Sequence, residues 1–174
     1  FRRREPLGHI IFHENTSNAI GHLIAQNCAN IGLAYFDKKD LKDFIAFSHK
    51  QRLNISYLFH DQLFLVVRKE SPLSALERIS VTEIQNRCFA VLPQFSLETP
   101  ELYAQFLGTN NRLTVLPSVP HIKQAILDWD ACGVLSSFAF KQDKSVNNED
   151  LRAIPLIAPE TEQCLSLCLI HLRI

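Results

Sequence analysis

The feature that most constrains the fold is a recurring unit in which an apolar run ends in a polar turn and a capped helix follows. The stretch FLVVRKESPLSALERISVTEI, residues 64–84, runs from apolar residues through charge and Ser-Pro-Leu to a helix start near Val81. Ser80 and Glu83 form an S-x-x-E capping box, a signature of a helix N-terminus. Because strand-like and helix-like segments alternate along the chain, the sequence predicts an α/β fold with largely parallel sheets.

The apolar runs and helix starts can be assigned along most of the chain. Expected strands cover residues 8–13, 30–36, 54–59, 63–67, 88–92, 112–116, 133–135 and 165–172, with a break at His60 and Asp61. Helices are expected after residues 15–17, near Leu41, near Val81, from Thr99 to Gly108, and from Ser118 and Pro120. Spacing places Ile122, Ala125, Ile126 and Trp129 on the buried stripe of the last helix.

Composition excludes several classes of protein. With 174 residues, 47% hydrophobic and 21% charged, the chain can form one ordinary domain or two small lobes. The net charge of zero gives no electrostatic reason for this chain to grip nucleic acid by itself. It has no apolar stretch near the ~18 residues that cross a bilayer. Five cysteines without a C-x-x-C spacing predict a reducing, cytoplasmic compartment.

Two lobes explain the order of elements better than one. Residues 1–60 and 163–174 are expected to form the first lobe, incomplete at its N-terminal side, and residues 68–150 the second. Residues 61–67 and 151–162 are the expected crossover segments. We also expect sequence upstream of Phe1, because the opening stretch resembles the tail of a helix that leads into a strand.

Polar residues follow the predicted strands at the turns where helices begin. These turns are residues 14–17, residues 93–96, Ser118 with His121, and Ser136 with Ser137. In open α/β sheets such turns lie at the carboxyl ends of strands, where ligands bind, and helix N-termini favour anions. The set therefore indicates a cleft for a small anionic or polar metabolite. The alternative for each single turn is plain helix capping.

Segments over nearly the whole chain resemble the effector domains of LysR-type transcriptional regulators. DQLFLVVRKESPLSALERISVTEIQNRCFAVL, residues 61–92, resembles the family's linker and the entry to its second lobe. NCANIGLAYF resembles its g-x-x-D-i-g-i strand, with Asn30 in place of Asp, and FRRREPLGHIIFHENTS resembles its F-x-x-x-x-P-x-v-x-i stretch. PSVPHIKQAILDWDACGVLSSFAF resembles the helix and glycine strand near the cleft. The family's first strand with its following helix, and its terminal helix, have no counterpart in this sequence.

The resemblance implies a type 2 periplasmic-binding-protein-like fold, with two α/β lobes joined by a two-strand hinge. It also implies a small-molecule effector between the lobes, a homodimer or homotetramer, and DNA binding through an N-terminal winged helix-turn-helix outside this chain. Carried over residue by residue, it implies that the ligand-binding residues are Asn15, Thr16, Gln94, Phe95, Ser96, Ser118 and Ser136.

Enzyme and metal chemistry find little support in the sequence. Cys164 and Cys168 would lie ~13 Å apart on a strand, too far to share a zinc ion at ~2.3 Å. Cys88 and Cys132 fall inside predicted strands, where thiols behave as small hydrophobes. Motifs such as G-x-S-x-G, H-E-x-x-H, G-x-G-x-x-G and the P-loop are absent. We therefore predict no catalytic residue, metal or cofactor.

The alternative functions are a stand-alone solute-binding receptor and a dehydratase-type enzyme on the same fold. A receptor would need an export signal upstream and would have to tolerate oxidation, which five cysteines argue against. A dehydratase would need a catalytic carboxylate or a threonine-based motif in the cleft, and Glu14 is the only evident acid there.

Overall fold

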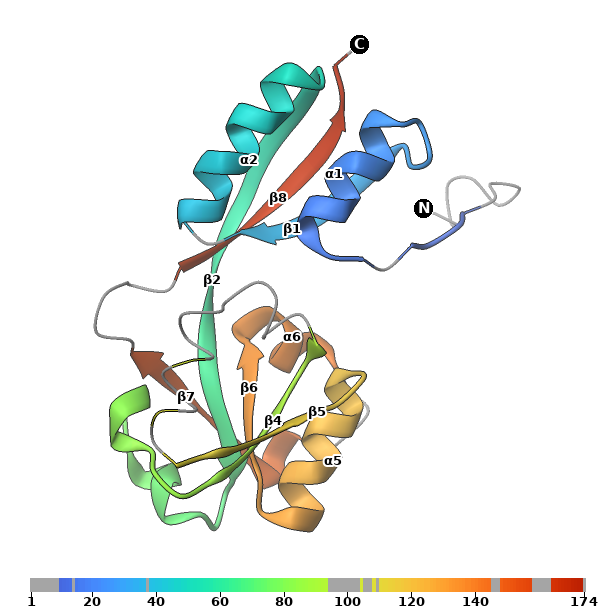
Figure 1. Cartoon of the computed structure of the whole chain (residues 1–174). Helices are drawn as coiled ribbons and strands as arrows, with labels where there is room; N and C mark the ends of the chain where they lie inside the picture. The colour runs from blue at the N-terminus through green and yellow to red at the C-terminus, as the bar shows by residue number, and fades with distance from the viewer. Residues whose placement is uncertain are drawn as a thin grey trace.

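A long strand that runs through two lobes organises the molecule (Figure 1). The computed structural model describes residues 10–13, 15–36, 38–93, 104, 108, 110–144, 148–157 and 164–173. Strand β2, Leu53–Arg68, pairs with one strand of the first lobe over its first part and with two strands of the second lobe over its last part. The partner changes between Gln62, which pairs with Cys164, and Leu63, which pairs with Ser136.

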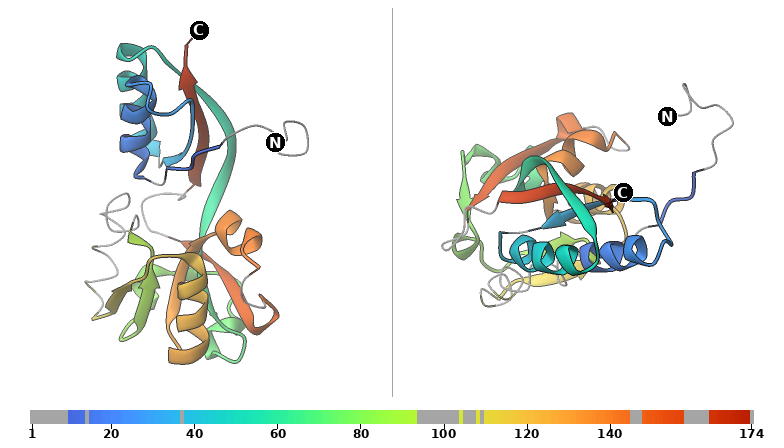
Figure 2. Two further views of the ribbon diagram at one scale, coloured as in Figure 1. Left: turned by 90° about the vertical axis from the view of Figure 1, so that its right-hand side faces the viewer. Right: turned by 90° about the horizontal axis from the view of Figure 1, so that it is seen from above.

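The first lobe is an antiparallel sheet with helices on one face. Its strands are β1 (Ile31–Phe36), β8 (Cys164–Leu172) and the first part of β2, with β8 in the middle. Helices α1 (Ser17–Ala25) and α2 (Lys38–Lys50) lie side by side over one face of this sheet (Figure 2). The core between them is apolar and contains Ile24, Ala34, Phe36, Phe44, Leu53, Cys168 and Ile170.

The second lobe contains a mixed sheet. Strands β4 (Cys88–Val91), β5 (Arg112–Val115) and β6 (Cys132–Ser136) are parallel to one another. The last part of β2 runs antiparallel between β6 and β7 (Leu151–Ile157), and β7 also pairs with the short β3 (Ile79–Ser80). The described residues of this lobe also form η1 (Pro72–Ala75), η2 (Val81–Glu83), α5 (Val119–Trp129), α6 (Ser137–Gln142) and η3 (Asn148–Asp150).

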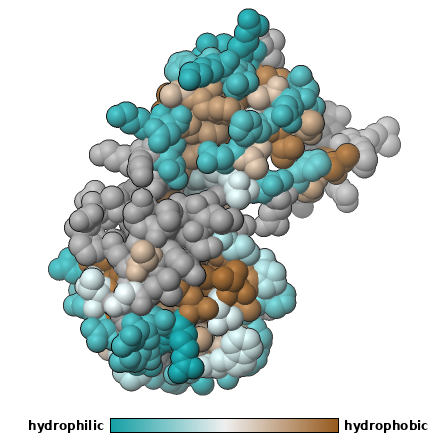
Figure 3. All heavy atoms as spheres, in the orientation of Figure 1, coloured by the Kyte–Doolittle hydropathy of each residue, from teal (hydrophilic) through white to brown (hydrophobic). Residues whose placement is uncertain are grey.

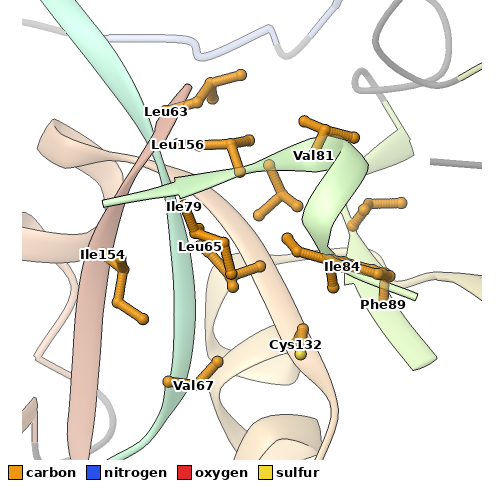
Figure 4. Close-up of a cluster of buried hydrophobic side chains, with 12 residues drawn as sticks. Leu63, Leu65, Val67, Ile79, Val81, Ile84, Phe89, Cys132, Ile154 and Leu156 are labelled. Carbon is orange, nitrogen blue, oxygen red and sulfur yellow. The ribbon is translucent and has the colours of Figure 1, made fainter. Parts of the chain in front are cut away.

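The second lobe buries β2 on both of its faces. Leu65 and Val67 point into the cluster shown in Figure 4, while Val66 packs on the opposite face with Ile122 and Ile126 of α5. A strand that is covered on both faces reads as a continuous apolar run rather than an alternating one. That requirement explains the run LFLVV in the middle of the chain.

The structure confirms most of the predicted elements and corrects others. His60 and Asp61 do not break the strand, because β2 continues from Leu53 to Arg68. The predicted strand at residues 8–13 is not a strand over residues 10–13, where Phe12 is 89% exposed. Trp129 is 62% exposed, so the prediction that it belongs to the core of its helix is wrong.

Other differences concern lengths and pairing. The helix predicted near Val81 is a single 3₁₀ turn, although both bonds of the capping box form. The helix predicted near Leu41 extends to Lys50. The first-lobe sheet is antiparallel rather than parallel. Within β7, which the sequence placed in a crossover, residues 151–155 pair with β2 and residues 156–157 with β3. The helix predicted from Thr99 to Gly108 lies mostly outside the described residues.

Apolar side chains also reach the surface. Figure 3 shows apolar surface over the first lobe, bordered by polar side chains. Ile31 and Leu33 of β1 are 64% and 55% exposed, on the sheet face away from the buried Ala34 and Phe36. Within the described part of the chain, no helix is long and apolar enough to cross a membrane.

The contact between β6 and α5 generates a stability prediction. A Cβ added at Gly133 would lie 2.7 Å from Cδ1 of Ile126 and 2.9 Å from Cγ2 of Ile122. We expect Gly133→Ala to lower the free energy of unfolding by about 1–3 kcal/mol, the usual cost of overpacking. Urea unfolding measures this change. Ile126→Val in the same background removes the closest methyl group and should recover part of the loss, whereas an unchanged stability in Gly133→Ala would contradict the packing.

Candidate functional site

The start of α1 lies beside the point where the chain crosses between the lobes. Thr16 is the N-cap of α1, and its side-chain oxygen accepts a hydrogen bond from the backbone N–H of Ala19 at 3.4 Å. The next residue, Ser17, is buried and donates from its hydroxyl to the carbonyl oxygen of Tyr35 at 2.7 Å. This bond ties the beginning of α1 to the end of β1, close to the crossing.

The start of α6 approaches the crossing from the second lobe. Ser136 ends β6, pairs with Leu63 of β2, and caps α6 by accepting from the backbone N–H of Ala139 at 3.1 Å. The ring of Phe138 packs against that of Phe59 with centroids 5.6 Å apart. Two predicted ligand residues, Thr16 and Ser136, therefore begin helices on opposite sides of the crossing.

A buried carboxylate joins these two sides. Asp61 is 5% exposed and lies on β2 at the crossing. Its Oδ2 accepts from the hydroxyl of Tyr35 at 3.1 Å, and its Oδ1 accepts from the backbone N–H of Gln62 at 2.9 Å. The backbone N–H of Phe138, in the first turn of α6, lies 3.2 Å from each carboxylate oxygen. The carboxylate thus bonds to both lobes and to its own strand.

The environment of Tyr35 keeps its hydroxyl in the neutral, donating form. Burial raises the pKa of Tyr35 well above its ordinary value, and the adjacent Asp61 carboxylate adds to this effect. The Ser136 side chain acts in the opposite direction and lowers this pKa. The hydroxyl of Tyr35 therefore stays protonated and donates to the carboxylate of Asp61 on β2.

The far end of α6 is held by a buried lysine. The side chain of Lys123, on α5, is fully buried, and Nζ donates to the carbonyl oxygens of Phe140 and Asp143 at 3.2 Å and 2.6 Å. Nζ also donates to Oδ1 of Asn148 at 2.8 Å. Burial lowers the pKa of Lys123, while the Asp143 carboxylate at 3.8 Å opposes that shift. The short helix α6 is therefore anchored at both ends.

Of the other predicted ligand residues, the structure describes Ser118 and Asn15. Ser118 is the N-cap of α5, but its hydroxyl contacts Nδ1 of His121 at 2.8 Å instead of capping the helix backbone. Asn15 is exposed just before α1. Gln94, Phe95 and Ser96 lie outside the described residues.

Sequence reasoning missed the two residues that connect the site, Tyr35 and Asp61. A signal for Asp61 was present, since a charged residue interrupts an otherwise β-rich run in FHDQLFLVV. We interpreted that charge as a break in the strand. A buried carboxylate inside a strand instead requires hydrogen-bond donors, and these come from distant segments that the sequence does not pair.

The segment that carries Cys168 is strand β8, as predicted. The described residues contain no group of three or more His, Cys, Asp and Glu that could hold a metal. Cys132 is buried, and burial raises its pKa to about 11, so its thiol is inert at neutral pH. Cys28 is exposed.

Comparisons with known proteins identify the fold. No protein-family model matches the chain, and no curated protein matches it by sequence. Solved structures do match. The reduced OxyR regulatory domain from Pseudomonas aeruginosa has a TM-score of 0.71 at 10% identity, over 99% of this chain and 78% of that one. The BenM effector-binding domain with its effector benzoate has a TM-score of 0.68 at 12% identity, over 99% and 74%.

A transport protein shares the same architecture. The substrate-binding protein of an amino acid ABC transporter matches with a TM-score of 0.61 at 14% identity, over 99% of this chain and 69% of that one. The fold is that of LysR-type effector-binding domains and is type 2 periplasmic-binding-protein-like, which confirms the resemblance at the level of fold. At these identities the likeness shows the fold alone.

The raised pKa of Tyr35 generates a prediction about alkaline stability. Its folded pKa lies above the ordinary 10.0, so the stability that the neutral hydroxyl contributes is complete below pH 10 and is lost as the pH rises further. Urea unfolding of wild type and Tyr35→Phe should show a stability difference that falls above pH 10. The fall is up to about 1.4 kcal/mol per pH unit, and less where solvent screens the site. A difference that stays constant from about pH 8 to 11 would contradict the burial of Tyr35.

Proposed function

We propose that the chain is the ligand-sensing regulatory domain of a LysR-type transcriptional regulator. It binds a small, anionic metabolite between its lobes and thereby modulates DNA binding by an N-terminal winged helix-turn-helix outside this chain. In this function the domain carries out no catalysis. The cytoplasmic location and the homodimer or homotetramer stay predictions.

The observation that carries this proposal is the meeting of two helix starts at the interlobe crossing. Ser17 at the start of α1 bonds to Tyr35, and Tyr35 bonds through Asp61 to the start of α6. Ligands of open α/β folds bind at such strand ends, where side chains from both lobes converge. Solved structures with this fold include an effector-binding domain that holds its effector benzoate, a carboxylate.

Three of the proposed ligand residues share one kind of position. Thr16, Ser118 and Ser136 each occupy the N-cap of a helix, where backbone N–H groups and a partial positive charge favour an anion. The carboxylate of Asp61 already bonds the Phe138 N–H at the start of α6. We therefore place the anionic group of the effector toward Thr16 rather than toward the start of α6, where the charge of Asp61 lies, and keep Ser96 as a predicted second partner.

A solute-binding receptor is the second candidate, because a transporter's substrate-binding protein shares the fold. The two functions differ in what precedes the domain. We expect the ~90 gene codons upstream of Phe1 to encode a winged helix-turn-helix, a single small domain of that order. Sequencing that region decides between them. A secretion signal there would favour the receptor, and another enzyme domain would end both proposals.

Thermal unfolding tests the ligand assignment. Small carboxylates, with benzoate as the first probe, should raise the melting temperature of the purified protein because they bind only its folded state. The double variant Thr16→Ala/Ser96→Ala should show a weaker rise. Ser56→Ala, on an exposed strand position of the first lobe, is the matched control and should respond as wild type does. If the double variant responds as fully as the control, these two residues do not bind the anion.

A further inference from the structure

We propose that Asp61 couples the effector site to the relative position of the lobes, as a positioning residue that bonds both walls of the site. This inference rests on the proposed function, since it assigns a regulatory role to the same site. It concerns a residue that sequence reasoning treated as an interruption between two strands.

The geometry sets Asp61 apart from an ordinary surface acid. Its side chain is buried at the crossing, and the groups that bond it come from three places: the end of β1, its own strand, and the first turn of α6. Tyr35 and Phe138 are far apart in sequence and belong to different lobes. A shift of one lobe relative to the other must therefore lengthen at least one bond to this carboxylate.

Burial makes these bonds costly to lose. A buried carboxylate is tolerated only while donors replace the water it gave up, and an unpaired one is strongly unfavourable. Hydrogen bonds to an ionised group also exceed neutral ones in strength. The described crossing of the chain at this point is a single strand, β2, which can bend more readily than a packed layer. The carboxylate therefore favours one arrangement of the lobes at the place where β2 passes between them.

The same bonds reach the residues proposed to bind the effector. Ser17, next to Thr16, donates to the carbonyl oxygen of Tyr35, while Ser136 caps α6, whose Phe138 N–H donates to Asp61. An effector that bonds to Thr16 or Ser136 therefore acts on a helix start that is hydrogen-bonded to Tyr35 or to Asp61. A change at the site thus alters the bonds of Asp61 and, through Phe138, the position of α6.

Amide hydrogen exchange tests this coupling without any effector. Tyr35→Phe removes one hydroxyl of the first lobe and should increase exchange at Gln62 and at Phe138, although neither residue is altered. The exchange rates of these two amides should rise about tenfold, the factor that corresponds to the net contribution of one charge-assisted hydrogen bond to stability. Peptides over β4, in the second-lobe core, report any general loss of stability. Tyr57→Phe, at a first-lobe tyrosine that is 51% exposed, is the matched control.

Asp61→Asn gives a second measurement, because it keeps the size of the side chain and removes its charge. Small-angle X-ray scattering of the folded variant should show a wider distribution of lobe separations than wild type. The proposal is overturned if Tyr35→Phe raises exchange at Gln62 but not at Phe138, if β4 changes by the same factor, or if Asp61→Asn scatters as wild type does. These outcomes leave the benzoate measurement unaffected, so failure of the coupling and failure of effector binding are distinguishable.

Discussion

The buried carboxylate of Asp61 is the interaction on which the arrangement of the two lobes depends. It lies on the one described strand that belongs to both lobes, and it accepts hydrogen bonds from each of them. Removing a charge from water is unfavourable unless donors surround it, so both lobes must supply donors at the same point. Tyr35 of β1 and Phe138 of α6 supply these donors.

The two sheets differ in a way that suits this arrangement. In the first lobe α1 leads the chain away from the crossing and β1 leads it back, so the start of α1 and the end of β1 both lie there. In the second lobe the parallel strands β4, β5 and β6 point the same way, and α6 begins where β6 ends. Lys123 then fixes the other end of α6 through buried hydrogen bonds. Rigid elements thus meet at a point that only one described strand crosses.

Local features of the fold were predictable from the sequence, whereas the site was predictable only in part. The caps at Thr16, Ser80 and Ser136 were recognisable because a cap depends on residues within one turn. The exposure of Trp129 was not predictable. Helical spacing shows which residues lie on the same face of a helix, but it does not show how far along the helix other elements cover that face. Residues 10–13 carry strand-forming side chains, yet a strand also needs a neighbouring strand to bond, and none is paired with them in the described structure.

The sequence by itself determined the alternation of strands and helices and the capped helix starts, because each depends on patterns over a few neighbouring residues. The two-lobed class of fold was predictable from the order of these elements and from the family resemblance over nearly the whole chain. Only the tertiary structure decided that β2 is one continuous strand and that Tyr35 and Phe138 both donate hydrogen bonds to the carboxylate of Asp61. The physical reason is that a buried charge is stabilised by donors wherever in the chain they come from. Asp61 is separated in sequence by 26 positions from Tyr35 and by 77 positions from Phe138. Contacts over such separations leave no periodic pattern in the sequence.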